Sequence, residues 1–275
     1  MKKRLGIFNF VIVSTTLFAA VIMAFSCKKE AAVSYVAEPV VQSYLVPGLP
    51  LSVYIKQEIL IGSTDTATQT INGLNNVTIT CVQTGIRYPL NFIGSGIYVD
   101  SAYKVVAGNT YNLSFTYNGT VVSASTVVPT KPTGMSISDT TLSIPPNTFD
   151  ISSVTPLTLN WSNPNNDYFL VLVQLTNSAD TLSPIDTAST SHFHRHSFFR
   201  NQPTQTNTSQ VSPRDFSYYG EYYVILYKVN ADYAELYNGS GNNSQNLTQP
   251  ITDIKNGLGM FSGINADTIR ISITN

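Results

Sequence analysis

Residues 110–128 read TYNLSFTYNGTVVSASTVV and carry the clearest structural signal in the chain. Two runs rich in Val, Thr and Tyr, at 110–117 and 120–128, flank the dipeptide Asn118-Gly119. Asn-Gly between such runs is a strong signal for a two-residue β-hairpin, because both turn positions need positive φ. The pattern therefore predicts an antiparallel hairpin at this place.

Similar segments precede this hairpin and extend the prediction to a whole module. Each is rich in Val, Ile, Tyr and Thr and is bounded by Gly, Pro or Asn, which is typical of strands. The predicted strands are 33–44, 51–59 and 76–83, and a second hairpin joins 87–92 to 97–99 through Gly94-Ser95-Gly96. Roughly seven strands in about 95 residues, without an amphipathic helix between them, predict an immunoglobulin-like or transthyretin-like sandwich over 33–128.

A second β-module is predicted after a linker at 129–134, whose two prolines cannot donate hydrogen bonds to a β-ladder. Beyond the linker, the only tryptophan, Trp161, ends an apolar strand and is followed by a turn and a strand that starts at Tyr168. This order resembles a fibronectin type III or immunoglobulin-like module, in which the indole packs between the sheets. The predicted fold is all-β, with two tandem sandwiches at 33–128 and 135–275.

Within the second module, the polar stretch 177–212 is either an insertion or a set of short edge strands. A strong strand is predicted at 221–229. Residues 230–237 predict a short helix with Asn230 as its N-cap, and 268–274 predicts a closing strand.

The sequence contains no recognisable catalytic motif. Gly257, Gly259 and Gly263 miss the dinucleotide-binding fingerprint by one position and predict a turn instead. Nucleophile elbows, zinc-protease helices and phosphate-binding loops are missing from the sequence. We therefore expect a protein that is not an enzyme and that holds no cofactor.

Composition narrows the classes of partner. Charged residues make up only 11% of the chain, against about 25% in an ordinary soluble domain. Fifteen basic and sixteen acidic residues give a net charge of −1, so there is no overall field that would gather nucleic-acid phosphates. The 43% hydrophobic content excludes intrinsic disorder. Nucleic acid is not an expected partner.

The N-terminus has the layout of an export signal, with three basic residues at 2–4 before an apolar stretch at 5–25. A small residue then precedes Cys27, which resembles the bacterial lipobox. That resemblance implies a signal peptide at 1–26, a lipid on Cys27 that binds the membrane, and a short polar tether at 27–32. The alternative is an uncleaved anchor, because about 20 apolar residues can span a bilayer.

Cys81 is the only other cysteine. If Cys27 carries lipid, Cys81 has no partner for a disulfide within the chain. Its place in an alternating apolar run predicts a buried thiol in a strand.

Several motifs along the chain, taken in their order, resemble one family. They are the lipobox at Cys27, Gly96-Ile97-Tyr98, Ala107 to Tyr111, the module around Trp161, and Ile254 to Phe261. Together they resemble the Bacteroidota outer-membrane lipoproteins of domain of unknown function 4249. The resemblance implies an outer-membrane or surface lipoprotein, often associated with TonB-dependent receptors, and it implies no catalytic residues.

All three histidines lie at two-residue spacing, at His192, His194 and His196. On a strand they would share a face, and three imidazoles can bind zinc or copper. No cysteine or glutamate lies nearby to complete such a site, so a solvated strand or loop and a partner contact stay open as alternatives.

Six Asp-Ser/Thr motifs resemble the acceptor sequence of the general O-glycosylation system of Bacteroidota. The alternative is that Asp-Thr is simply a common junction between turn and strand. The candidate acceptors are Thr66, Ser101, Thr140, Thr181, Thr187 and Thr268.

A tyrosine-rich stretch at 215–223 supplies a possible binding face, because tyrosine offers a large amphipathic surface. The candidates are Tyr218, Tyr219, Tyr222 and Tyr223, although strand alternation also predicts that half of them are core residues.

Taken together, these features predict a surface-exposed outer-membrane lipoprotein that acts as a non-catalytic accessory or binding component. The favoured partner is a TonB-dependent β-barrel or another envelope protein. The alternatives are a free-standing adhesin or glycan-binding lipoprotein and, less favoured, a degradative enzyme whose site the sequence hides.

Overall fold

The hairpin at 110–128 is present as strands β7 (Thr110–Tyr117) and β8 (Thr120–Val127). Asn118 and Gly119 have φ values of 48° and 79°, as a two-residue turn requires. Alternate residues of the hairpin, such as Leu113 and Phe115, are buried. The prediction from the Asn-Gly signal is therefore confirmed.

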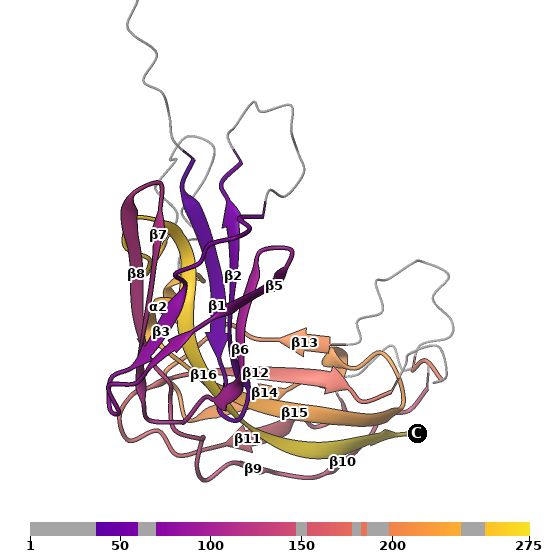
Figure 1. Cartoon of the computed structure of the whole chain (residues 1–275). Coiled ribbons are helices and arrows are strands. Elements are labelled where there is room, and N and C mark those ends of the chain that lie inside the picture. The colour runs from indigo at the N-terminus through magenta and orange to yellow at the C-terminus, as the bar shows by residue number, and fades with distance from the viewer. Residues whose placement is uncertain (1–36, 60–69, 147–152, 178–182, 186–197, 238–250) are drawn as a thin grey trace, which may run out of the picture. The chain divides into compact units, whose positions relative to one another are not determined.

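The computed structural model describes residues 37–59, 70–146, 153–177, 183–185, 198–237 and 251–275 (Figure 1). Strands dominate this part of the chain, so the predicted all-β sandwich fold is confirmed. The remaining strands are β1 (Pro39–Leu45), β2 (Pro50–Gln57), β3 (Thr78–Cys81), β4 (Arg87–Pro89), β5 (Asn91–Gly94), β6 (Ile97–Lys104), β9 (Ser136–Ile137), β10 (Thr141–Ser143), β11 (Leu157–Asn160), β12 (Tyr168–Leu175), β13 (Phe198–Arg200), β14 (Thr208–Val211), β15 (Gly220–Val229) and β16 (Leu258–Thr274). A 3-10 turn, η3 (Pro213–Asp215), and one short helix, α2 (Ala231–Glu235), complete the described elements.

The N-terminal sandwich packs two sheets against each other. One has the strand order β4-β3-β7-β8, and the other contains β1, β2, β6 and β5 together with the start of β16. Their facing side chains form one hydrophobic core that includes Ile55, Tyr98 and Phe115. Cys81 lies in this core as a free, fully buried thiol, as its strand position predicts.

The predicted strand at 87–92 is divided between the two sheets. Residues 87–89 form β4, which pairs with β3, whereas 91–94 form β5, which pairs with β6. Leu90 is buried where the chain crosses from one sheet to the other. The local pattern could not separate the two strands because both are short and only Leu90 lies between them.

The C-terminal sandwich has a large sheet of β13, β12, β15, the later part of β16 and β10, and a small sheet of order β14-β11-β9. Trp161 follows β11, is only 5% exposed and packs against Phe169 with ring centroids 5.6 Å apart. The prediction that the indole fills the core of this module is thus confirmed.

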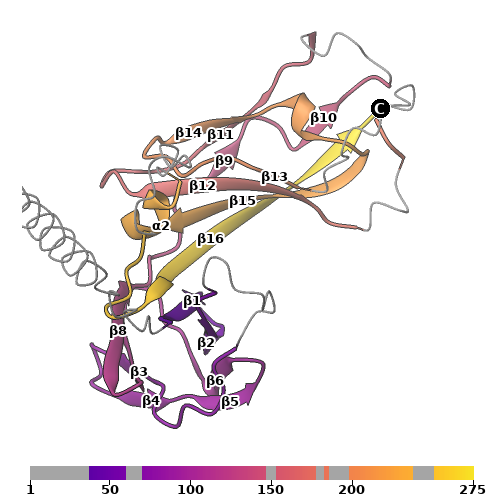
Figure 2. The same cartoon turned by 90° about the horizontal axis from the view of Figure 1, so that it is seen from above.

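Strand β16 belongs to both sandwiches (Figure 2). Its first part, Leu258–Gly263, pairs in parallel with β1, and Ile264–Ile273 pairs antiparallel with β15. Phe261 is fully buried in the N-terminal core. The predicted second module at 135–275 is therefore corrected, because 254–263 contributes to the first sandwich.

The predicted turn at Gly257, Gly259 and Gly263 is also wrong for the last two glycines, which lie inside β16. A Cβ at Gly259 would lie 1.9 Å from the carbonyl oxygen of Val41, and one at Gly263 would lie 2.4 Å from that of Val127. These glycines let β16 approach the backbones of β1 and β8. The closing strand thus begins at Leu258 and not at Thr268.

The remaining predicted elements differ from the observed ones only in detail. The helix is shorter than 230–237, and the polar stretch 177–212 contains the short edge strands β13 and β14 among its described residues. Among the described residues, no helix has the length and apolar character needed to span a membrane. The proposed signal segment lies outside those residues.

Candidate functional site

The outer face of the C-terminal large sheet carries a groove of about 530 Å³. It is lined by four strands of this sheet, by β1 and by α2. The lining residues are Tyr44, Leu170, Leu172, Gln174, Phe198, Arg200, Tyr227, Val229, Tyr233 and Ile264. We call this feature the aromatic groove.

Strand register explains the floor of the aromatic groove. Leu170 on β12 is opposite Tyr227 on β15, and Leu172 is opposite Arg200 on β13. Because side chains on opposed residues share a face, they form one continuous surface. Val229 and Ile264, which are also opposite each other, extend that surface towards β1.

Aromatic rings form one wall of the groove. The Tyr44 ring from β1 meets the Tyr233 ring from α2 edge-on, with centroids 5.9 Å apart. The hydroxyl oxygens of Tyr233 and Tyr237 are 3.3 Å apart. The Arg200 guanidinium lies over the Tyr237 ring, 5.3 Å from its centroid, in a cation–π arrangement. The wall thus joins β1, α2 and β13.

Burial is the main influence on the pKa of Tyr44 and of Tyr233. Burial raises the pKa of Tyr44, Tyr237 and Asp253 raise it further, and Arg200 opposes the shift. Burial and the hydrogen bond with Tyr237 also raise the pKa of Tyr233. Among the residues that the structure describes, Arg200 is the only charged one that lines the groove. The groove therefore suits a ligand with an apolar or aromatic body and a negative group near Arg200.

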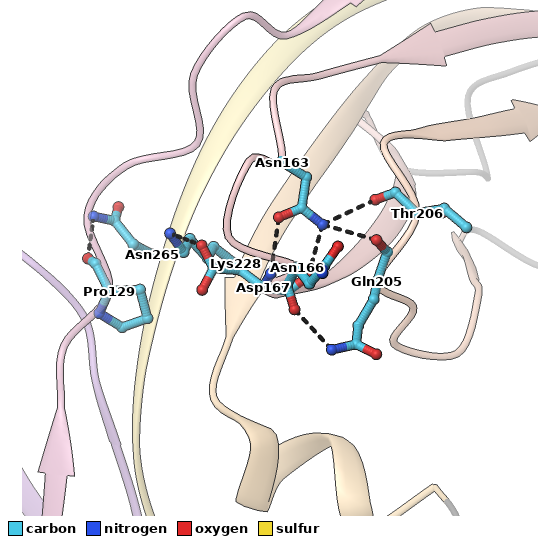
Figure 3. Close-up of polar contacts among 8 residues, drawn as sticks. All are labelled: Pro129, Asn163, Asn166, Asp167, Gln205, Thr206, Lys228 and Asn265. Carbon is cyan, nitrogen blue, oxygen red and sulfur yellow. Dashed lines mark hydrogen bonds and ion pairs between the residues drawn. The ribbon is translucent and has the colours of Figure 1, made fainter.

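A second pocket, of about 480 Å³ and lined by polar and apolar residues, lies where the linker after β8 passes the start of β12 and the end of β15. Lys228 forms an ion pair with Asp167, with 2.5 Å between Nζ and Oδ2. The Asn163 side chain holds the turn before β12 against the loop that contains Gln205 (Figure 3). We call this feature the amide pocket.

A family model described as "Domain of unknown function (DUF4249)" matches residues 36–270. The chain belongs to the DUF4249 family. None of the curated proteins compared with it matches. Among solved structures, domains A168-A170 from titin align with 10% sequence identity and a TM-score of 0.22, over 71% of this chain and 62% of the titin chain. At that TM-score the similarity supports no inference about this DUF4249 protein.

The predicted tyrosine face does not exist as a unit. Tyr222 is 1% exposed in the core, and its hydroxyl donates to the carbonyl of Tyr218 at 2.9 Å. Tyr219 is half-buried and donates to the carbonyl of Ile144. Only Tyr223 is exposed, on the same face of β15 as the aromatic groove. The alternation of β15 turns neighbouring tyrosines to opposite sides of the sheet.

The other predicted sites divide into described and undescribed positions. Ser101, Thr140 and Thr268 are exposed, as acceptors for a glycan must be. The candidates Cys27, Thr66, Thr181, Thr187, His192, His194 and His196 lie outside the described residues. Among the residues that the structure describes, no cluster of His, Cys, Asp or Glu could hold a metal ion.

Sequence reasoning missed the residues that build the aromatic groove. Tyr44, Arg200 and Tyr233 come from β1, β13 and α2, which are far apart in the chain. A partial signal was present, because Tyr44 and Phe198 are large outward-facing residues at alternating strand positions. The fold alone brings them together.

Proposed function

We propose that this DUF4249 protein is a non-catalytic binding component of an outer-membrane complex, held in the membrane by lipid on Cys27 and exposed at the cell surface. The favoured partner is a TonB-dependent β-barrel of a Bacteroidota envelope. The aromatic groove is the observation that supports a binding role most strongly.

The occupant that we propose for the groove is an extended, acidic segment of the partner protein with apolar or aromatic side chains. The floor of Leu170, Leu172 and Ile264 would bury such side chains. Arg200 would pair with a carboxylate, because none of the described residues that line the groove is acidic. A volume of about 530 Å³ lies within the roughly 300–1,000 Å³ range of pockets that hold small ligands or a few residues.

Membrane anchoring would strengthen a weak groove interaction. A lipid tether restricts the protein to the membrane that holds the barrel, so the effective concentration of each partner for the other rises. Two or more acyl chains suffice for stable anchoring, since each buried CH₂ contributes about 0.8 kcal/mol.

Purification of the tagged, lipidated protein from its native membrane in mild detergent tests this proposal. We expect a TonB-dependent barrel to co-purify in stoichiometric amount, as identified by mass spectrometry. Recovery of the protein alone would contradict the proposal and favour a free-standing adhesin.

Charge reversal in the groove separates specific binding from general detergent effects. Arg200→Glu places a negative charge where we expect the partner's carboxylate, so recovery of the barrel should fall at least about tenfold, equivalent to about 1.4 kcal/mol. Arg214→Glu is the matched control, because Arg214 is exposed on η3 and does not line the groove.

A further inference from the structure

We propose that the amide pocket binds a neutral carbohydrate unit. This site is distinct from the aromatic groove and shares only Val229 with it. Its lining combines polar and apolar residues and comes from the end of β8 and the linker after it, from Gly108 before β7, from the turn before β12, from the segment after β13, and from the end of β15 with the start of α2. The lining residues are Gly108, Val127, Val128, Pro129, Thr130, Asn166, Asp167, Tyr168, Gln205, Lys228, Val229, Asn230 and Ala231.

One wall of the pocket is fixed by hydrogen bonds before any ligand arrives. Asn163 Nδ2 donates to the carbonyl oxygens of Asp167 and Gln205 at 3.0 and 2.8 Å, and Asn163 Oδ1 accepts from the Asp167 amide at 2.8 Å. Gln205 Nε2 donates to the carbonyl of Asn166 at 2.7 Å. Figure 3 shows these residues around one turn. Such prior fixation lowers the entropy cost of binding.

The opposite wall is fixed to the N-terminal sandwich. Asn230 Nδ2 donates to Thr126 Oγ1 and to the carbonyl of Val127, at 2.8 and 2.9 Å. Asn265 Nδ2 donates to the carbonyl of Pro129 at 2.9 Å, which holds the linker in place (Figure 3). Both walls of the pocket are therefore rigid.

Several polar atoms remain without a partner among the described residues. They are Asp167 Oδ1, Gln205 Oε1, Asn230 Oδ1 and the whole side-chain amide of Asn166. Carboxylate and amide oxygens accept hydrogen bonds and amide nitrogens donate them, whereas each sugar hydroxyl does both. These groups match a ligand that presents several adjacent hydroxyls.

Charge and an aromatic ring narrow the class of ligand. Lys228 and Asp167 neutralise each other in an ion pair, so the described part of the lining carries no unpaired charge that would select an anion or a cation. Tyr168, half-buried in the lining, offers an aromatic ring for the C–H face of a sugar. A neutral, hydroxyl-rich ring satisfies both features.

Saturation-transfer NMR on the detergent-solubilised full-length protein tests this inference. The probes are glucose, galactose, mannose, N-acetylglucosamine, maltose, cellobiose and lactose. We expect saturation transfer to at least one of them. Failure of every probe to receive saturation would overturn the proposal.

A matched pair of variants locates the binding. Asn166 has a φ of 54°, so Asn166→Gly keeps the turn and its carbonyl but removes the amide from the pocket. We expect at least fivefold weaker saccharide binding in Asn166→Gly. Asn165→Gly changes the neighbouring exposed residue, which does not line the pocket, and should bind as the wild type does.

A groove variant distinguishes this site from the proposed partner site. Phe198→Ala alters the aromatic groove and should leave saccharide binding unchanged. Loss of saccharide binding in Phe198→Ala but not in Asn166→Gly would show that the saccharide binds in the aromatic groove, and it would overturn the proposal. The saccharide result does not depend on whether a barrel co-purifies, so the two proposals fail independently.

Discussion

The ring of Tyr44 in β1 lies edge-on against the ring of Tyr233 in α2, with centroids 5.9 Å apart and planes at 80°. Tyr44 belongs to the N-terminal sandwich, whereas Tyr233 follows the longest strand pairing of the C-terminal one. The pair therefore makes one wall of the aromatic groove out of both sandwiches. A ligand in the groove would contact both.

Removal of the Tyr44 ring should weaken the packing between the two sandwiches and the binding of the partner in the aromatic groove. Tyr44→Ala loses an aromatic pair, and such pairs contribute about 0.5–1.5 kcal/mol beyond buried area. We expect the free energy of unfolding to fall by about 1 kcal/mol in urea titrations, and barrel recovery to fall too. Tyr223→Ala is the control, because Tyr223 is 41% exposed, against 40% for Tyr44, and does not line the groove. Equal effects of the two substitutions would contradict the role of the Tyr44 ring.

Gly263→Ala should be strongly destabilising. The new methyl group would lie 2.4 Å from the carbonyl oxygen of Val127 and 2.6 Å from Val128 Cα, both backbone atoms that side-chain rotation cannot move. Overpacking of this kind costs about 1–3 kcal/mol or more. Gly48→Ala is the comparison, because a Cβ at position 48 meets no atom within 4 Å and only the φ of +81° is unfavourable for alanine. The melting temperature of Gly263→Ala should be well below that of Gly48→Ala. The reverse order would contradict a close approach of β16 to β8.

The two sandwiches should unfold together because β16 contributes to both cores. Trp161 fluorescence reports on the C-terminal core, and the reactivity of the buried Cys81 thiol reports on the N-terminal core. In a Cys27→Ser variant, both probes should show one urea midpoint. Two separated midpoints would mean that the modules are independent.

Asp253 should make stability depend on pH. Burial raises its pKa from 3.8 to about 6, although the Phe261 amide donates to its carboxylate at 3.0 and 3.1 Å. Between pH 3.8 and about pH 6 the folded state binds more protons than the unfolded state. The free energy of unfolding that this carboxyl contributes therefore falls as the pH rises through that range. Asp253→Asn keeps an oxygen that can accept from Phe261 and removes the charge. Its gain in melting temperature over the wild type should be larger at pH 7.5 than at pH 4.5, and a gain that does not change with pH would contradict this assignment.

The hairpin at 110–128 and the burial of Trp161 could be predicted from sequence because their signals are local. Asn118-Gly119 selects its turn through backbone conformation, and Trp161 sits at the end of an apolar strand. The start of strand β16 could not be predicted, because the contacts that determine it are with residues distant in the chain. Gly259 and Gly263 resemble turn residues, but they are needed for contacts with β1 and β8, which are distant in the chain.

The candidate sites could be predicted only in part. The tyrosine-rich stretch reaches β15, whose alternation buries Tyr222 and exposes Tyr223 as the sequence pattern predicts, and neither residue lines the aromatic groove. Arg200 and Tyr233 had no local signal that linked them to Tyr44. Their proximity depends on the pairing of β12 with β13 and of β16 with both β1 and β15.

Photo-crosslinking from the groove in native membranes tests the central claim most directly. A benzoylphenylalanine at position 44 would face the groove, and one at position 223 would lie on the same sheet face outside it. We predict that position 44 crosslinks to peptides of a TonB-dependent barrel and that position 223 does not. Equal crosslinking from the two positions, or none from position 44, would contradict a partner-binding groove.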